Sequence, residues 1–204
     1  MATTIVSLHL LVFTLLVFQC YGANLNQGAT TFIKTSCRAT RYPPLCVQTL
    51  SSYANSIQQN PHELAQTALS VGLARDGSAA KFILGLTRTA GLKPREKQAL
   101  KDCMANMGVT VAQLKRSIKE LSQTDNLPKR SFSWRVGNVQ TWVSTAITNG
   151  NNCLDGFSGS AMDGSVKGAV SPKVLSVVQV TSNALALVNN FAARHKSGTA
   201  TNIP

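Results

Sequence analysis

The chain has 204 residues and a formal net charge of +12 at pH 7, from 20 Lys and Arg residues against 8 Asp and Glu residues. That length suits one domain with a substantial core, so no division into several domains is expected. The positive charge points to polyanionic surroundings, and the few acidic residues leave little material for general acid–base catalysis.

Residues 1–22 have the pattern of a secretory signal peptide. Ile5 to Phe18 is almost wholly apolar and contains no Asp, Glu, Lys or Arg, and it is too short to cross a hydrocarbon core of about 30 Å as a helix. The residues at Cys20 and Gly22 suit signal peptidase, so we predict cleavage after Gly22 or one residue later. A retained anchor is the alternative, but no Lys or Arg precedes the run. No later segment is expected to span a membrane.

Cleavage would remove Cys20 and leave four cysteines in an oxidising compartment, where an even count predicts two disulfide bonds. The four are Cys37, Cys46, Cys103 and Cys153. Three pairings are open, and pairing of sequence neighbours is the simplest. Its loops of about 10 and about 50 residues would contribute roughly 3 and 4 kcal/mol in the chain-entropy model.

The rest of the chain is typical of an all-α protein. Stretches rich in Ala, Leu, Gln and Lys alternate with short Pro, Gly and Asn clusters, and strand signals are weak. Residues 31–56 contain Pro43 and Pro44, which exclude one continuous helix and predict a helical hairpin.

Two long helices are expected next. The first should begin at Asn60-Pro61, a cap followed by proline, and end near Gly91, with Asp76-Gly77 as a candidate kink. The second has the clearest apolar stripe, with residues three and four apart from Met104 to Leu121.

Two further helices complete the pattern. One should follow the basic loop Leu127-Pro128-Lys129-Arg130 and end near Asn149-Gly150. Glycines make residues 155–171 a flexible connection, after which Ser171-Pro172 opens the last helix.

The predicted architecture is an up-down-up-down four-helix bundle with an N-terminal helical hairpin at about residues 30–58. The domain is expected to cover residues 23–197. Residues 198–204 lack periodicity and are expected to be a disordered tail.

No catalytic motif is found. His62 and His195 fall in a first and a last helical turn, where we expect solvated surface groups. Asp102 and Glu96 are expected on a charged helix face and not in a catalytic pair. Nucleophile-elbow, phosphate-loop and zinc patterns are missing. We therefore predict a protein that is not an enzyme and that needs no cofactor or metal.

Four segments around the cysteines carry a specific pattern. They are Cys37–Cys46, Ala99–Cys103, Asn138–Thr148 with Cys153–Phe157, and Ser182–Leu187. Together they resemble the plant invertase and pectin methylesterase inhibitor family, and the likeness covers about residues 30–194.

The resemblance implies a four-helix bundle, disulfide bonds Cys37–Cys46 and Cys103–Cys153, and no catalysis. It also implies a secreted protein of the plant cell wall, monomeric when free, that inhibits pectin methylesterase. In the one-to-one complex, helices would lie across the pectin-binding groove of the enzyme. The Pro-Lys-Phe element of invertase inhibitors is not reproduced, because Arg130 follows Pro128-Lys129 and Phe132 is displaced.

Three positions are candidate contacts in that complex. Relatives often have Thr before the fourth cysteine and an acidic residue two places after the third and the fourth. This chain has Asn152, Ala105 and Asp155 at these positions. For Asp155, the one retained residue, a turn role in which it bonds its own backbone is the alternative.

Other functions compete with this one. They are inhibition of a cell-wall or vacuolar invertase, a cationic pectin-binding or membrane-binding defence role, lipid transport and a structural role in the wall. Secretion makes nucleic acid a poor partner for the positive charge and anionic pectin a better one. The charge could equally serve to keep the protein soluble.

Overall fold

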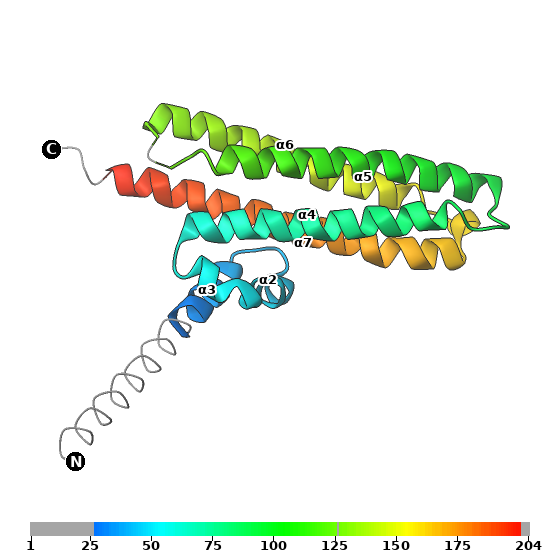
Figure 1. Cartoon of the computed structure of the whole chain (residues 1–204), viewed down its shortest axis with the longest axis horizontal. Coiled ribbons are helices and arrows are strands. Elements are labelled where there is room, and N and C mark those ends of the chain that lie inside the picture. The colour runs from blue at the N-terminus through cyan, green and yellow to red at the C-terminus, as the bar shows by residue number, and fades with distance from the viewer. Residues whose placement is uncertain (1–26, 126, 201–204) are drawn as a thin grey trace, which may run out of the picture.

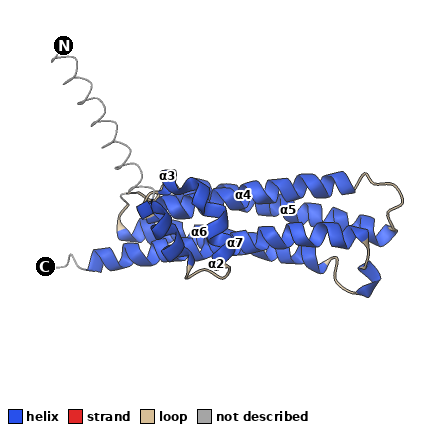
Figure 2. Cartoon of the chain, turned by 90° about the horizontal axis from the view of Figure 1, so that it is seen from below, coloured by secondary structure: helices blue, strands red, loops and turns tan. Residues whose placement is uncertain are grey.

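The computed structural model describes residues 27–125 and 127–200, so the predicted signal peptide and residues 201–204 of the predicted tail lie outside the described residues. Regular structure in the described part is helical, as Figures 1 and 2 show, and the all-α prediction is confirmed. The elements are helical residues 27–37, α2 (Pro43–Leu50), η1 (Ser51–Tyr53), α3 (Ala54–Ile57), α4 (Pro61–Leu86), α5 (Pro94–Leu121), α6 (Lys129–Asp155), η2 (Ser160–Met162) and α7 (Ser165–Ala200).

The four long helices form the predicted up-down-up-down bundle (Figure 1). Each packs against its two neighbours in the order α4, α5, α6, α7, and α7 closes the bundle against α4. The N-terminal hairpin lies beside one end of the bundle, where α2 contacts α4 and α7.

Side-chain caps set where α4 begins. The Asn60 side chain accepts hydrogen bonds from the backbone N–H groups of His62 (2.9 Å) and Glu63 (3.4 Å), and Pro61 occupies the first turn. The helix continues through Asp76-Gly77 and ends at Leu86, earlier than expected. Gly91 belongs to the loop that follows, where its φ of +77° favours glycine.

Glu96 caps α5, so its predicted place on a charged face is wrong. Its carboxylate accepts a hydrogen bond of 2.8 Å from the backbone N–H of Lys93, and the residue is buried. Asp102 is exposed as expected and accepts a hydrogen bond from Gln98.

The predicted end of the next helix at Asn149-Gly150 is also wrong. The helix α6 continues to Asp155, and Lys129 and Arg130 form its first turn instead of a loop. Gly150 is buried, and a Cβ built there would lie 2.6 Å from Cγ2 of Val178 on α7. This glycine therefore permits close approach of two helices and does not end one.

The predicted start of α7 at Ser171-Pro172 is also wrong. The helix begins at Ser165, and Pro172 lies inside it, so the expected flexible connection includes the first turns of α7. Pro172 lacks the N–H that would bond the carbonyl of Gly168. Both residues are exposed, so water can satisfy that carbonyl.

The length and composition of α7 need explanation. Within the described residues, Ser165–His195 is long and apolar enough to span a membrane, with a mean hydropathy of 1.2, contrary to our expectation. Half of the apolar window is buried inside the bundle, so packing against α4 and α6 accounts for its composition. The helix also continues to Ala200, past residue 197, after which the tail was expected to begin.

Two disulfide bonds are present, in the nearest-neighbour pairing. Cys37–Cys46 closes the hairpin, with a Cα–Cα distance of 5.6 Å, and Cys103–Cys153 joins α5 to α6 at 4.3 Å. All four cysteines are buried.

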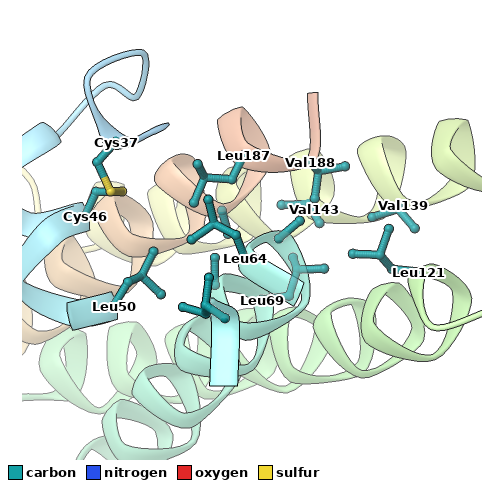
Figure 3. Close-up of a cluster of buried hydrophobic side chains, with 14 of the residues drawn as sticks. Cys37, Cys46, Leu50, Leu64, Leu69, Leu121, Val139, Val143, Leu187 and Val188 are labelled. Carbon is teal, nitrogen blue, oxygen red and sulfur yellow. A yellow bond between two sulfur atoms is a disulfide. The ribbon is translucent and has the colours of Figure 1, made fainter. Parts of the chain in front are cut away.

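Two apolar clusters make up the core. One fills the end of the bundle beside the hairpin, where Leu50, Leu64, Leu121, Val139 and Leu187 converge (Figure 3). The other fills the opposite end, around Cys103–Cys153.

A polar level separates the two clusters. Along every long helix the residues between them include small or polar ones, namely Gly72, Asp76, Thr110, Gly150 and Thr181. The hydroxyl of Thr110 donates to the carbonyl oxygens of Asn106 (3.1 Å) and Ala146 (3.3 Å).

Among the described residues, neither the carboxyl group of Asp76 nor the hydroxyl of Thr181 has a hydrogen-bond partner. Asp76 is fully buried, and this desolvation raises its pKa from 3.8 to about 7.

We expect the stability of the protein to fall as the pH rises from about 4 to about 7. The Asp76 carboxyl of the unfolded chain ionises near 3.8, whereas in the folded protein it stays protonated up to about 7. Stability is therefore full below 3.8, and the shift corresponds to a loss of about 4 kcal/mol across the window. Urea unfolding of the parent and of Asp76→Asn over this pH range tests the effect. The variant should have the flatter profile, Asp102→Asn should resemble the parent, and parallel profiles for Asp76→Asn and the parent would refute the assignment.

The longer disulfide loop should contribute more stability. Cys103–Cys153 spans a sequence separation of 50 and Cys37–Cys46 one of 9. Replacing both cysteines by serine should lower the free energy of unfolding by about 4 kcal/mol for the first bond and about 3 kcal/mol for the second. A chain ending at Ser197 is the control and should lose much less. A Cys103→Ser/Cys153→Ser variant with the thermal midpoint of the parent would show that the bond contributes no stability.

Candidate functional site

The three predicted contact residues lie at the level of the Cys103–Cys153 bond. Ala105 on α5 and Asn152 and Asp155 on α6 are all exposed. Asn152 and Asp155 are three residues apart and therefore lie on the same side of α6. Ala105 follows Cys103 by two residues and so projects away from the side of α5 that faces α6. The structure thus brings Asn152 and Asp155 together and leaves Ala105 on the neighbouring helix.

Asn152 and Asp155 extend a polar stripe that the sequence analysis missed. Successive spacings of three, four, four and three residues place five exposed side chains on one outer face of α6. We call this the α6 stripe; it consists of Thr141, Ser144, Thr148, Asn152 and Asp155. A helical-period search for hydroxyl and amide side chains could have found it, whereas a search for apolar residues could not.

The side chains of the α6 stripe are short and mostly uncharged. Thr141 and Thr148 donate to the carbonyl oxygens of Gly137 (3.0 Å) and Ser144 (3.1 Å) on their own helix. A shallow hollow of about 480 Å³ adjoins the stripe and is lined by Gln140, Thr141, Ser144, Thr145 and Thr148. A partner can therefore approach the helix closely and still find hydroxyl groups to bond.

Asp155 is the acidic end of the stripe. It is the last residue of α6, where a carboxylate faces the negative end of the helix dipole and costs stability. The turn after it is held by backbone bonds, from Gly156 N to Asn152 O and from Ser158 N to Asp155 O. Within the described part of the chain the carboxylate has no hydrogen bond or ion pair, so it is available to a binding partner.

The family-like segment 138–148 contributes three residues to the α6 stripe, and its opposite side is structural. Val139, Val143 and Ala146 are core residues. The ring of Trp142 packs against Arg116 on α5, with 4.4 Å between the guanidinium carbon and the ring centroid. This segment therefore holds α5 and α6 together beneath the stripe.

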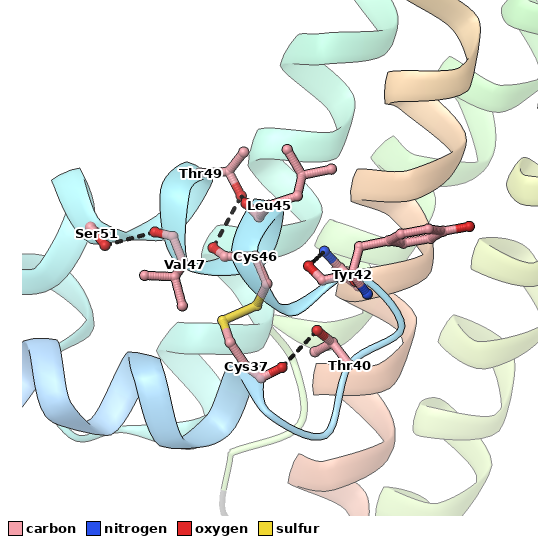
Figure 4. The surroundings of a disulfide bond; sticks show 9 residues. Cys37, Thr40, Tyr42, Leu45, Cys46, Val47, Thr49 and Ser51 are labelled. Carbon is pink, nitrogen blue, oxygen red and sulfur yellow. Dashed lines mark hydrogen bonds between the residues drawn. A yellow bond between two sulfur atoms is a disulfide. The ribbon is translucent and has the colours of Figure 1, made fainter.

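The family-like segments 37–46 and 182–187 fix the N-terminal hairpin to the bundle. The Cys37–Cys46 bond closes a loop in which Thr40 donates to the carbonyl of Cys37 at 2.8 Å (Figure 4). Asn183 of α7 binds both backbone groups of Tyr42, accepting from its N–H and donating to its C=O at 2.9 Å each. The hairpin is thereby fixed to the bundle.

The histidines do not fit the predicted solvated positions. His62 is buried, with Nε2 3.0 Å from the carbonyl oxygen of Leu121 and its ring 5.3 Å from that of Phe191. His195 is half-buried and stacks on Phe132 at 3.6 Å. Both rings are covered by other helices, since His62 contacts α5 and α7 and His195 contacts α6. No group of three His, Cys, Asp or Glu residues in the described ranges is placed to hold a metal ion.

Comparisons with known proteins point to one family. The model of the family described as plant invertase/pectin methylesterase inhibitor matches residues 31–187. The "21 kDa protein" of Daucus carota is 48% identical over 82% of this chain and 87% of its own. Pectinesterase inhibitor 9 of Arabidopsis thaliana is 47% identical over 87% and 89%, and pectinesterase inhibitor 11 of the same plant is 45% identical over 83% and 85%.

A solved structure has the same fold. A crystal structure of a mutant form of a pectin methylesterase inhibitor from Arabidopsis superposes with a TM-score of 0.62 at 22% identity, covering 77% of this chain and 95% of that one.

Proposed function

Since the chain belongs to the plant invertase/pectin methylesterase inhibitor family, we propose that it inhibits a plant pectin methylesterase in a one-to-one complex. The α6 stripe lies across the pectin-binding groove of the enzyme and excludes the substrate. The observation that carries this proposal is the stripe itself, an exposed row of short polar side chains that ends in the unpaired carboxylate of Asp155.

Rigidity of α6 favours this role. The helix is bonded covalently to α5 through Cys103–Cys153 and approaches α7 closely at Gly150. A surface that is ordered before binding loses less conformational entropy in the complex. With 27 residues, α6 is about 40 Å long and can extend along a groove that holds several sugar rings.

The chemistry of the stripe also suits such a groove. A groove that binds polysaccharide carries hydrogen-bonding groups, which must be paired again when the sugar is displaced. Hydroxyl and amide side chains can both donate and accept, so the stripe can satisfy groups of either kind. Asp155 adds one charge-assisted bond, which is stronger than a neutral one.

Inhibition of invertase is the less favoured function. Two relatives at 47% and 45% identity are named as pectinesterase inhibitors. Phe132, the residue nearest to the Pro-Lys-Phe pattern, is 1% exposed and packs in the core, so it is not available to a partner.

We also propose that the protein is secreted to the cell wall. The predicted leader and the two disulfide bonds suit an oxidising compartment. We propose that the free protein is a monomer and has no catalytic role of its own.

An arginine introduced into the α6 stripe should prevent the enzyme from approaching the helix closely. We expect Thr148→Arg and Asn152→Arg each to weaken inhibition of a plant pectin methylesterase by at least about ten-fold, and Asp155→Asn to weaken it less. The measurement is methanol release from methyl-esterified pectin as a function of inhibitor concentration. Ser70→Arg, a similar change at an exposed position of α4, is the matched control and should leave inhibition unchanged. Full inhibition by both stripe variants, with folding verified by circular dichroism, would exclude the stripe as the contact surface.

The positive charge of the protein should mainly raise its association rate with the enzyme. Charges interact over only about 8 Å at physiological ionic strength, so the association rate with the enzyme should fall as salt is added, while the dissociation rate changes less. Surface plasmon resonance at several salt concentrations separates the two rates. An association rate independent of salt would mean that the net charge of +12 serves solubility alone.

A further inference from the structure

A single exposed aromatic ring lies at the other end of α6. Trp134 is 65% exposed, more than any other large apolar side chain in the described part of the protein. It lies beside a shallow hollow of about 350 Å³, lined by Arg130, Ser131, Trp134 and Arg135. An isolated exposed apolar side chain is common on protein surfaces, so the case for a binding site depends on the charged groups beside the ring.

The unpaired charges beside this ring are positive. Lys129 and Arg130 occupy the first turn of α6, which has no acidic residue and no side-chain cap. The positive end of the helix dipole adds to these charges, and this placement costs stability. A local arrangement that opposes stability is expected where binding requires it.

Of the three cations near the ring, Arg135 is paired with an acidic group, whereas Lys129 and Arg130 are not paired within the described residues. Glu120, on α5, lies 3.4 Å from Arg135, which also donates to Gln123 at 2.8 Å and is thereby held in place. Asp125 lies 3.8 Å from His62. Within the described residues neither Lys129 nor Arg130 forms an ion pair.

We propose that this end of α6 binds a saccharide that carries carboxylate groups, namely a chain of uronic acid residues. The flat face of Trp134 stacks on the C–H face of a sugar ring, and the guanidinium group of Arg130 binds a carboxylate. Lys129 adds positive potential along the chain.

The surroundings favour a saccharide over a protein partner. Residues that dominate protein interfaces lie within a ring of packed neighbours that exclude water. The exposed neighbours of Trp134 are instead Lys129, Arg130, Ser131 and Ser133, all of them polar. One isolated ring among cations and hydroxyl groups matches a polar ligand whose apolar surface is a single sugar face.

The proposed saccharide site adjoins the near end of the α6 stripe and lies far from its acidic end. Trp134 is seven positions, about 10 Å, from Thr141 and 21 positions, about 30 Å, from Asp155. Hydrolysis of pectin methyl esters yields uronate carboxylates, so the ligand has the chemistry of the product of the enzyme. The inhibitor could then be held on stretches of polymer that are already de-esterified. Saccharide binding does not depend on the proposed inhibition and can be measured without the enzyme.

The test is binding of purified oligogalacturonates to the full secreted protein by isothermal titration calorimetry. Trp134→Ala and Arg130→Ala should each weaken binding by at least about ten-fold, Trp134→Phe should retain part of it, and added salt should weaken it. Fully methyl-esterified oligomers of the same length should bind much less, because they lack the carboxylates. In a Trp142→Phe background Trp134 is the only tryptophan, so saturable quenching of its fluorescence by oligogalacturonate provides a second readout.

Two controls distinguish this site from general charge attraction. Lys101→Ala removes one exposed cation elsewhere, and Tyr53→Ala removes one exposed aromatic side chain elsewhere. Both should bind oligogalacturonate as the parent does. Parent-like binding by Trp134→Ala, or equal losses in Lys101→Ala, would overturn the proposal. A Trp134→Ala variant that keeps saccharide binding but binds methylesterase less tightly would show that the ring contacts protein instead.

Discussion

The covalent bond between Cys103 and Cys153 is the constraint on which the rest of the arrangement depends. It holds α5 and α6 with their Cα atoms 4.3 Å apart inside one of the two core clusters. With α6 fixed on this side and packed closely on α7 at Gly150, its outer face has little freedom to rotate. The polar side chains of that face are therefore presented to a partner in one orientation, and little entropy is lost when the partner binds.

The middle of the bundle contains a buried polar group in place of a covalent or apolar contact. A fully buried carboxyl group without a hydrogen-bond partner among the described residues lies between two apolar clusters. Because burial keeps Asp76 protonated up to a pKa of about 7, this level is neutral in acid and carries a charge only above that range. Such a core is best suited to a mildly acidic environment, which agrees with the proposed role in the cell wall.

The two ends of α6 present side chains of different chemistry on the same face of the helix. Near Cys153 the face offers short uncharged groups and one carboxylate, which suit an enzyme groove. Near Lys129 it offers an aromatic ring and cations, which suit a uronate chain. One rigid helix of about 40 Å can therefore address an enzyme and its acidic polymer at separate points.

Local patterns in the sequence were sufficient for the all-α class, the order of the four long helices and the cap at Asn60, because caps and apolar stripes depend on residues within a few positions of one another. The exposure of Ala105, Asn152 and Asp155 also agrees with their candidate role. Helix ends at Gly150 and Pro172 were misjudged, since packing against Val178 explains the glycine and exposure of the freed carbonyl permits the proline. Burial of His62, Glu96 and Asp76, and the isolation of Trp134, were decided only by the tertiary structure, because they depend on which distant helices cover each side chain.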